Sequence, residues 1–237
     1  MIDTVILQFI FNCLDKIDLK RFKPVAQSGF KRWVNNPTKI DKSKWGYLPK
    51  YTLTQRDNVF FLTSEFSAEK LLFKDNINEN AEHDFENTVS RFREVSGAMG
   101  VLFASEQIRK ARVLTFHPAK NIILSKCYNP TFIIGELAKV DISRKFDIDR
   151  KEFRNGGEVL QFYTNQHALC FYDKVRDLGK PAKRAFDKDQ TAKQMNLFDN
   201  LSGITEILRM EARLKRKKMR DIFEKIGYNN YEPTFEE

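Results

Sequence analysis

Residues 158–174, EVLQFYTNQHALCFYDK, carry the pattern that decides the fold. Two runs rich in aromatic and apolar residues flank Thr164-Asn165-Gln166, a composition typical of a β-hairpin. Residues 204–216, ITEILRMEARLKR, add a strand with clean alternation, because leucine, methionine and alanine fall on one face and arginine, glutamate and lysine on the other. These stretches predict an antiparallel sheet whose neighbouring strands are joined by short turns.

Working outward, the same reasoning predicts strands over residues 1–11, 58–66 and 111–117, where Pro118 ends the last strand or lies at its edge. Residues 45–55 are predicted to form a strand pair, or one strand with a turn at Pro49. Helical spacing of apolar residues predicts helices over 81–100, from Asn129 to about Val140, over 191–200 and after residue 216, with a polar loop over 178–190.

Because strands outnumber helices, the sequence predicts an α+β fold, with an antiparallel central sheet and helices packed on one face. The simplest organisation is a single domain. Residues 1–216 form its main part, and residues 217–237 add a basic helix and an acidic tail that belong to the same domain.

Composition narrows the class of protein. The chain has 237 residues, and 41 Lys and Arg against 32 Asp and Glu leave a net charge of +9, which favours a polyanionic partner such as nucleic acid. No apolar run approaches the roughly 18–20 residues of a membrane span, so no membrane association is expected. Three scattered cysteines indicate a reducing compartment, most simply the cytoplasm. Neither GxxxxGK[ST] nor GxGxxG occurs, and no nucleotide cofactor is expected.

Candidate chemistry lies on three strands. Glu211 falls between Arg209 and Arg213 on one strand face, an arrangement that can hold a divalent cation with the acid and phosphates with the guanidinium groups. The alternative is a solvated face with local ion pairs. Tyr172 and Lys174 place a phenol next to an ammonium group, which can favour the phenolate or hold the phosphate that it attacks.

His117 ends a third strand, where a lone histidine is more often a satisfied polar residue than a ligand. Taken together, however, a phenol nucleophile, an acid and an imidazole that can hold a cation, and nearby basic residues are the parts that a tyrosine nuclease needs.

Five stretches, in order, resemble one known family. They are MIDTV (1–5), EFSAEKLL (65–72) followed by Asp75-Asn76, ARVLTFHPAKN (111–121), YDKVRDL (172–178) and LRMEARLK (208–215). The chain resembles the gene-II-type rolling-circle replication initiators of filamentous phages and related phage and plasmid Rep proteins. The likeness runs from residue 1 to about residue 216.

The resemblance implies an HUH-like tyrosine endonuclease with an RRM-like sheet. Such an enzyme nicks one strand of origin DNA by metal-dependent transesterification, forms a 5′-phosphotyrosine, frees a 3′-hydroxyl primer and later rejoins the ends. It implies that Tyr172 is the nucleophile and Lys174 holds the scissile phosphate. A Mg²⁺ or Mn²⁺ ion would be bound by Glu211, His117 and Glu65. The implied DNA contacts are Lys70, Arg112, Arg209, Arg213, Lys215 and His167.

Three positions depart from the family pattern, one of them being Lys74-Asp75 in place of the more common Gly-Asn. His117-Pro118 stands where an acid is usual, and Asp177 replaces a glutamate. The expected partners are single-stranded or hairpin origin DNA and a host helicase, in the cytoplasm of a bacterial host. Two alternatives stay open: a non-catalytic DNA-binding relative such as a repressor, and a transposase or relaxase with the same chemistry.

Overall fold

A computed structural model of the chain describes residues 2–26, 29–75, 77–125, 127–140, 150–154, 158–179, 206–228 and 232–237. Its strands are β1 (Ile2–Phe11), β2 (Lys23–Val25), β3 (Lys31–Asn35), β4 (Lys50–Arg56), β5 (Val59–Phe66), β6 (Arg112–Leu124), β7 (Arg150–Arg154), β8 (Val159–Tyr163), β9 (His167–Asp173) and β10 (Glu206–Lys215). Its helices are η1 (Leu19–Arg21), α1 (Lys39–Trp45), α2 (Ala68–Phe73), η2 (Glu82–Asp84), α3 (Phe85–Ala98), α4 (Ser105–Arg109), α5 (Pro130–Lys139), α7 (Lys174–Gly179) and α9 (Arg216–Lys225).

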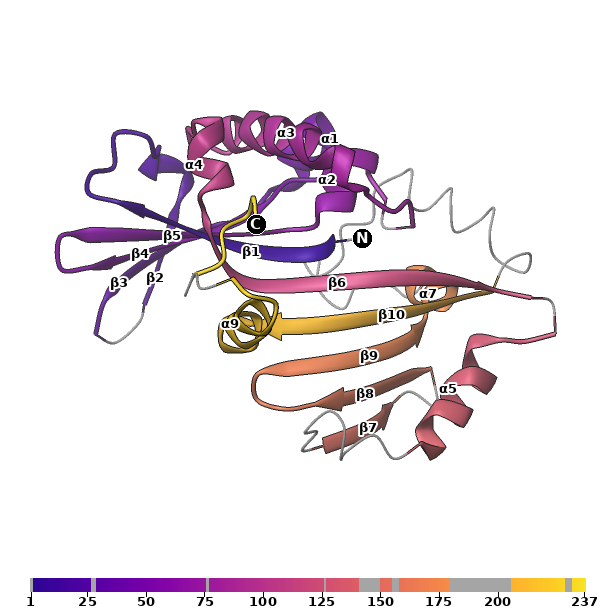
Figure 1. The fold of residues 1–237 in the computed structure, drawn as a ribbon. Coiled ribbons are helices and arrows are strands. Elements are labelled where there is room, and N and C mark those ends of the chain that lie inside the picture. Colours follow the sequence, from indigo (N-terminus) through magenta and orange to yellow (C-terminus); the bar gives the residue numbers. More distant parts are fainter. Residues whose placement is uncertain are drawn as a thin grey trace.

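All of the strands belong to one sheet, in the order β2-β3-β4-β5-β1-β6-β10-β9-β8-β7, and every neighbouring pair is antiparallel (Figure 1). The predicted α+β class is therefore confirmed. The first strand and the last strand of the chain both lie near the centre of the sheet, on either side of β6.

The apolar core lies on one face of this sheet. The register places Val5, Phe116 and Leu214 on the same face, where they join a cluster with Phe92 of α3 and Met219 of α9. A second cluster packs Ile134 of α5 against Leu160, Phe162 and Leu208. Leu208 lies six residues from Leu214 along β10, an even number, so both clusters share a face. The helices α3, α5 and α9 therefore cover one side, and the other side is left for polar side chains.

The predicted hairpin is confirmed. The β8–β9 turn closes with a bond from the Thr164 amide to the His167 carbonyl (2.8 Å), and Thr164 Oγ1 accepts from the Gln166 amide (3.1 Å). Helix α5 begins at Pro130 behind the side-chain cap of Asn129, as predicted. At the end of the 81–100 helix, Gly100 has φ = 78°, a conformation that favours glycine.

One boundary prediction is wrong. The strand that begins near Ala111 does not end at Pro118 but continues to Leu124. In the pairing of β1 with β6, Ile2 lies opposite Pro118 and Thr4 lies opposite His117. Asp3 is therefore an extra residue in β1 without a residue opposite it in β6, which is a β-bulge. A proline has no backbone N–H to donate to the neighbouring strand, and the bulge at Asp3 lies next to the place where Pro118 interrupts the hydrogen bonding.

The strand expected within 45–55 begins at Lys50, directly after Pro49. Residues 178–179 close α7, whereas the rest of the predicted loop up to residue 190 and the predicted helix over 191–200 lie outside the described residues. In the described part of the chain, no helix is long and apolar enough to cross a membrane.

Candidate active site

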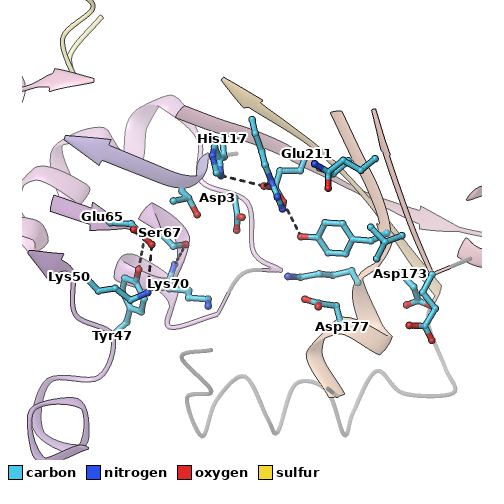
Figure 2. Close-up of a pocket in the computed structure, with 18 residues that line it drawn as sticks. Asp3, Tyr47, Lys50, Glu65, Ser67, Lys70, His117, Asp173, Asp177 and Glu211 are labelled. Carbon is cyan, nitrogen blue, oxygen red and sulfur yellow. Dashed lines mark hydrogen bonds and ion pairs between the residues drawn. The ribbon is translucent and has the colours of Figure 1, made fainter. Parts of the chain in front are cut away.

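A cavity of about 440 Å³ opens on the face of the sheet opposite the core helices (Figure 2). Side chains from β1, β5, β6, β9 and β10 form its floor, and the short helices α2 and α7 stand at its sides. Seven residues predicted from sequence line this cavity: Glu65, Lys70, His117, Tyr172, Lys174, Glu211 and Arg213. Residues from both ends of the chain thus converge, because β1 and β10 flank β6.

Glu211 is the centre of the polar contacts. Its side chain is 3% exposed. The Tyr172 hydroxyl donates to Oε2 at 3.3 Å, while His117 Nδ1 lies 3.4 Å and Arg213 Nε 2.8 Å from Oε1. One carboxylate oxygen thus meets the phenol of Tyr172, and the other meets the imidazole of His117 and the guanidinium of Arg213.

This environment fixes the charge of Glu211. Burial alone raises the pKa of this carboxyl, but the hydrogen bond with His117 and the charge of Arg213 outweigh burial and bring the pKa to about 2. Glu211 is therefore ionised throughout the neutral range, either as an acceptor for the phenol proton or as a ligand for a cation.

Tyr172 sits at the edge of the same floor. Burial raises the pKa of its phenol well above 10, and the nearby charge of Arg209 opposes that rise. The phenol is neutral in the resting protein, so attack on a phosphate requires positive charge near the oxygen as it ionises.

Lys174 supplies one such charge. It is the first residue of α7, it is 1% exposed, and its Nζ lies 5.8 Å from the centre of the Tyr172 ring. Burial and the neighbouring Arg209 lower the pKa of Lys174 to about 7, although Asp3 and Asp177 act in the opposite direction. An incoming phosphate would favour the charged form, so the amine is suited to take up a proton when substrate binds.

The other side of the cavity carries a second tyrosine and lysine. Tyr47 Oη accepts a hydrogen bond from the Ser67 amide at 2.7 Å, and Lys70 Nζ lies 5.9 Å from the Tyr47 ring centre. Glu65 is 49% exposed at its side chain and pairs with Lys50 at 3.6 Å. In Figure 2, Glu65 lies on the other side of the cavity from Glu211, with Asp3 between them, so the structure does not bring Glu65 to the predicted cation pocket.

The predicted DNA contact by Arg209 does not fit the structure. Its side chain is fully buried, and its guanidinium forms an ion pair with Asp3 (2.7 Å), donates to Asn121 Oδ1 (3.1 Å) and lies 3.7 Å from Glu69. Alternation places Arg209 on the same face as Glu211 and Arg213, as predicted, but Asp3 and α2 cover it. A guanidinium under this cover does not reach a DNA backbone.

Three other predicted DNA contacts lie outside the cavity lining. His167 Nδ1 lies 3.0 Å from Thr164 Oγ1 in the hairpin turn, and Lys215 Nζ donates to the Asn165 carbonyl at 2.9 Å. Arg112 pairs with Glu232 near the C-terminus. Of these, Lys215 continues the exposed edge of β10 beyond Arg213.

A divalent cation finds a partial set of donors here. His117 Nδ1 and Glu211 Oε1 are 3.4 Å apart, about the spacing of two ligands on one ion, and imidazole with carboxylate suits Mn²⁺ or Mg²⁺. Among the described residues, no group of three or more His, Cys, Asp or Glu side chains is gathered closely enough to hold a metal. Asp3 also lines this cavity and lies between Glu65 and Glu211 in Figure 2.

Sequence reasoning missed Asp3, Glu69 and Tyr47. The signal for Asp3 was present, because an acid interrupts the apolar run of the first strand.

Comparison of the chain with protein-family models, with curated proteins and with solved structures gave no significant match.

Proposed function

We propose that this protein is a tyrosine nickase that cleaves one DNA strand by transesterification and remains joined to the new 5′ end. The observation that carries the proposal is the meeting of the Tyr172 hydroxyl with Glu211 inside a cavity that Lys174 and Arg213 also line. A phenol, an ionised acceptor and buried positive charge are together the requirements for a phosphotyrosine intermediate.

The reaction balances without an external energy source. Tyr172 Oη forms a bond to phosphorus while the bond from phosphorus to the 3′ oxygen breaks. The phenol proton leaves along the hydrogen bond to Glu211 and passes to solvent, and the 3′ oxygen takes a proton from the Lys174 ammonium. One phosphodiester replaces another, so the reverse attack by the 3′-hydroxyl rejoins the strand.

A bound Mg²⁺ or Mn²⁺ would supply positive charge to the non-bridging phosphate oxygens. Glu211 and His117 are the residues that would hold it. Arg213 keeps Glu211 in position from the other side of the same oxygen, and its own side chain is 45% exposed toward solvent. It can therefore orient the carboxylate and contact a phosphate.

The substrate best suited to this site is single-stranded DNA or the unpaired part of a hairpin. The tyrosine lies in a recessed cavity on a sheet face, which a paired base step would not enter without unstacking. Lys50, Lys70 and Lys215 provide charge for the flanking backbone, and binding should weaken steeply with salt.

The site and the five family-like stretches together favour a replication initiator over a repressor. A pure binding protein has no use for a phenol directed at a buried carboxylate, or for the cost of burying these charges. We place the reaction in the cytoplasm of a bacterial host, where a host helicase would supply the unpaired strand.

A covalent-capture assay tests the proposal. The purified chain is incubated with Mn²⁺ and a set of end-labelled single-stranded and hairpin oligonucleotides, then separated in denaturing gel. A labelled protein band that survives denaturation and disappears in Tyr172→Phe is the expected result. Adducts that persist in Tyr172→Phe would assign the nucleophile elsewhere, and no adduct with any oligonucleotide would favour a binding protein.

A further inference from the structure

In the half of the sheet formed by β1–β5, the two faces differ sharply in burial. Burial alternates along β1, β4 and β5, so that Leu7, Tyr51 and Leu62 are buried while the residues on either side of each are not. These buried side chains pack with Phe92 of α3, which lies on their side of the sheet (Figure 1). The opposite side of the same strands carries no fully buried side chain among the described residues.

The strand register assigns the residues on that uncovered side. Glu65 of β5 and its partner Lys50 of β4 both line the active-site cavity. Thr63 and Phe61 share the face of Glu65, because side chains alternate along a strand. Pairing through β4, β3 and β2 carries this face to the edge of the sheet. We call it the open face, and its main members are Lys23, Arg32, Lys50, Arg56, Phe61 and Thr63.

The open face is positively charged. Its cations are Lys23, Arg32, Lys50 and Arg56, and Glu65 is the only acid that the described residues of β2–β5 place on this side. Glu65 pairs with Lys50 at 3.6 Å. A second copy of this face, or an apolar surface, would bury the remaining charges without compensation, which is costly. The open face therefore suits an occupant that carries negative charge of its own.

Apolar side chains lie between these charges. Ile10 of β1 is 47% exposed and lies opposite Phe61, and Val25 of β2 is 39% exposed and lies opposite Arg32. Unpaired bases present flat surfaces that stack on aromatic side chains, whereas the bases of a duplex are stacked on one another. A single-stranded nucleic acid thus matches both the charge and the apolar part of the open face.

We propose that the open face is a binding track for single-stranded DNA, continuous with the active-site cavity at Lys50 and Glu65, along which the strand crosses β5, β4 and β3 toward β2 and stacks a base on Phe61. The inference deepens the proposed function and rests on it for the identity of the strand as DNA. Five strand spacings separate β6 from β2, roughly 24 Å at about 4.8 Å each. About seven nucleotides cover that length at about 3.4 Å each, so the track requires a long unpaired segment on one side of the cleaved phosphate.

Binding without cleavage tests the charge of the track. A fluorescein-labelled oligothymidylate of about 20 nucleotides is titrated with the chain in EDTA, and its anisotropy is recorded at several salt concentrations. Lys23→Gln combined with Arg56→Gln, both at exposed positions, should reduce the slope of log affinity against log salt by about 1.4, because each single-strand phosphate contact contributes about 0.7. The matched control is Arg93→Gln combined with Lys139→Gln, which removes two exposed cations from α3 and α5 and should leave the slope unchanged.

A second substitution tests base stacking. Phe61→Leu keeps an apolar side chain but removes the aromatic ring, so affinity for the oligothymidylate should fall about fivefold or more. Phe132→Leu, at an aromatic residue of α5 that is 52% exposed, is the control and should bind normally.

Photocrosslinking locates the strand on the unaltered chain, so this readout does not depend on the folding of a variant. 5-Iodouracil replaces thymine at one position of the oligonucleotide at a time, and the crosslinked peptides are sequenced. Crosslinks to the β5 peptide that contains Phe61 are expected from a limited set of positions.

The outcomes separate this inference from the proposed function. Normal binding by both open-face variants, without crosslinks to β5, would overturn the inference even if the chain forms covalent adducts. Weaker binding by these variants with no adduct under any condition would overturn the nickase and leave the track in place. A duplex bound as tightly as the single strand, or polyaspartate bound as tightly and weakened equally by the variants, would assign the open face to another partner and overturn the inference.

Discussion

Two regions of the sheet share a local design but differ in what their tyrosines do. In β4–β5–α2 and in β8–β9–α7, a hairpin leads into a short helix (Figure 1), and a lysine of that helix lines the cavity. Lys70 lies 5.9 Å from the ring of Tyr47, and Lys174 lies 5.8 Å from the ring of Tyr172. The hydroxyl groups differ, because Tyr47 accepts from a backbone amide whereas Tyr172 donates to Glu211.

The difference comes from the neighbouring strands. The hairpin β8–β9 lies against β10, which brings Arg209 and Glu211 beside Tyr172. The hairpin β4–β5 lies against β1, and Tyr47, which precedes β4, accepts a hydrogen bond from the Ser67 amide at the start of α2. The two tyrosines next to lysines therefore meet different partners: Tyr172 meets Glu211 of the paired strand β10, whereas Tyr47 meets a backbone amide.

The largest expected effect separates the two tyrosines. Tyr172→Phe should abolish covalent adducts, a loss of at least about 10³-fold, because the attacking oxygen is removed. Binding of the same oligonucleotide should stay within about threefold, since backbone contacts dominate affinity. The covalent-capture gel and fluorescence anisotropy measure the two quantities. Tyr128→Phe, at an exposed tyrosine, is the control and should form adducts at the normal rate.

Substitutions of Lys174 and Lys70 should affect different quantities, the rate of adduct formation for Lys174 and the affinity for DNA for Lys70. Lys174→Met is expected to slow adduct formation by about 100-fold at saturating DNA, because a buried donor next to the phosphate is lost. Lys70→Met should mainly weaken binding and reduce the slope of log affinity against log salt by about 0.7, the value for one single-strand phosphate contact. Equal effects of both changes on rate and on salt slope would contradict the distinction.

The buried carboxyl of Glu69 makes a pH-dependent contribution to the free energy of unfolding. Burial raises the pKa of Glu69 to about 8, so between pH 4.5 and 8 the folded state binds more protons than the unfolded state. Stability from this group is present below pH 4.5 and is lost as pH rises to 8. Urea unfolding should therefore show a fall between pH 5 and 8 that is smaller in Glu69→Gln, by roughly 2–4 kcal/mol.

A parallel fall in both proteins would show that Glu69 is ionised at pH 5 and that its cavity is wetter than the structure indicates. The comparison of the two proteins cancels titrations elsewhere in the chain, such as those of the three histidines.

The smallest effect concerns the structural tyrosine. Tyr47→Phe removes the acceptor for the buried Ser67 amide and should lower the free energy of unfolding by about 1–3 kcal/mol. Adduct formation should stay within about threefold of normal when measured well below the melting temperature. A loss of adducts comparable to that in Tyr172→Phe would mean that the two tyrosines are not divided as described.

Much of this fold was predictable because its signals are local. Alternation in β10, the turn at Thr164–Gln166 and the cap at Asn129 each depend on residues within a few positions of one another. The passage of β6 through Pro118 was not predictable in this way. It depends on a bulge at Asp3, which lies more than a hundred residues away in sequence and pairs only in the folded sheet.

The site was predictable to the same extent. Alternation along β10 correctly placed Arg209, Glu211 and Arg213 on one face, but alternation does not say which of them another element covers. That Arg209 is buried follows from Asp3 and Glu69, whose side chains reach it from β1 and α2. Tyr47 gave no sequence signal, because its role depends on the amide of a distant strand end.

The position of β10 in the sheet bears on when the candidate site is completed during synthesis of the chain. This strand is the last of the sheet to leave the ribosome, yet it inserts between β6 and β9, which emerge earlier and have no partner on that side until it arrives. It also carries Glu211, the acceptor for the Tyr172 hydroxyl. A nascent chain that has not yet released residue 215 therefore has Tyr172 without the carboxylate that accepts its hydroxyl, and under the proposed function such a chain would not yet nick DNA.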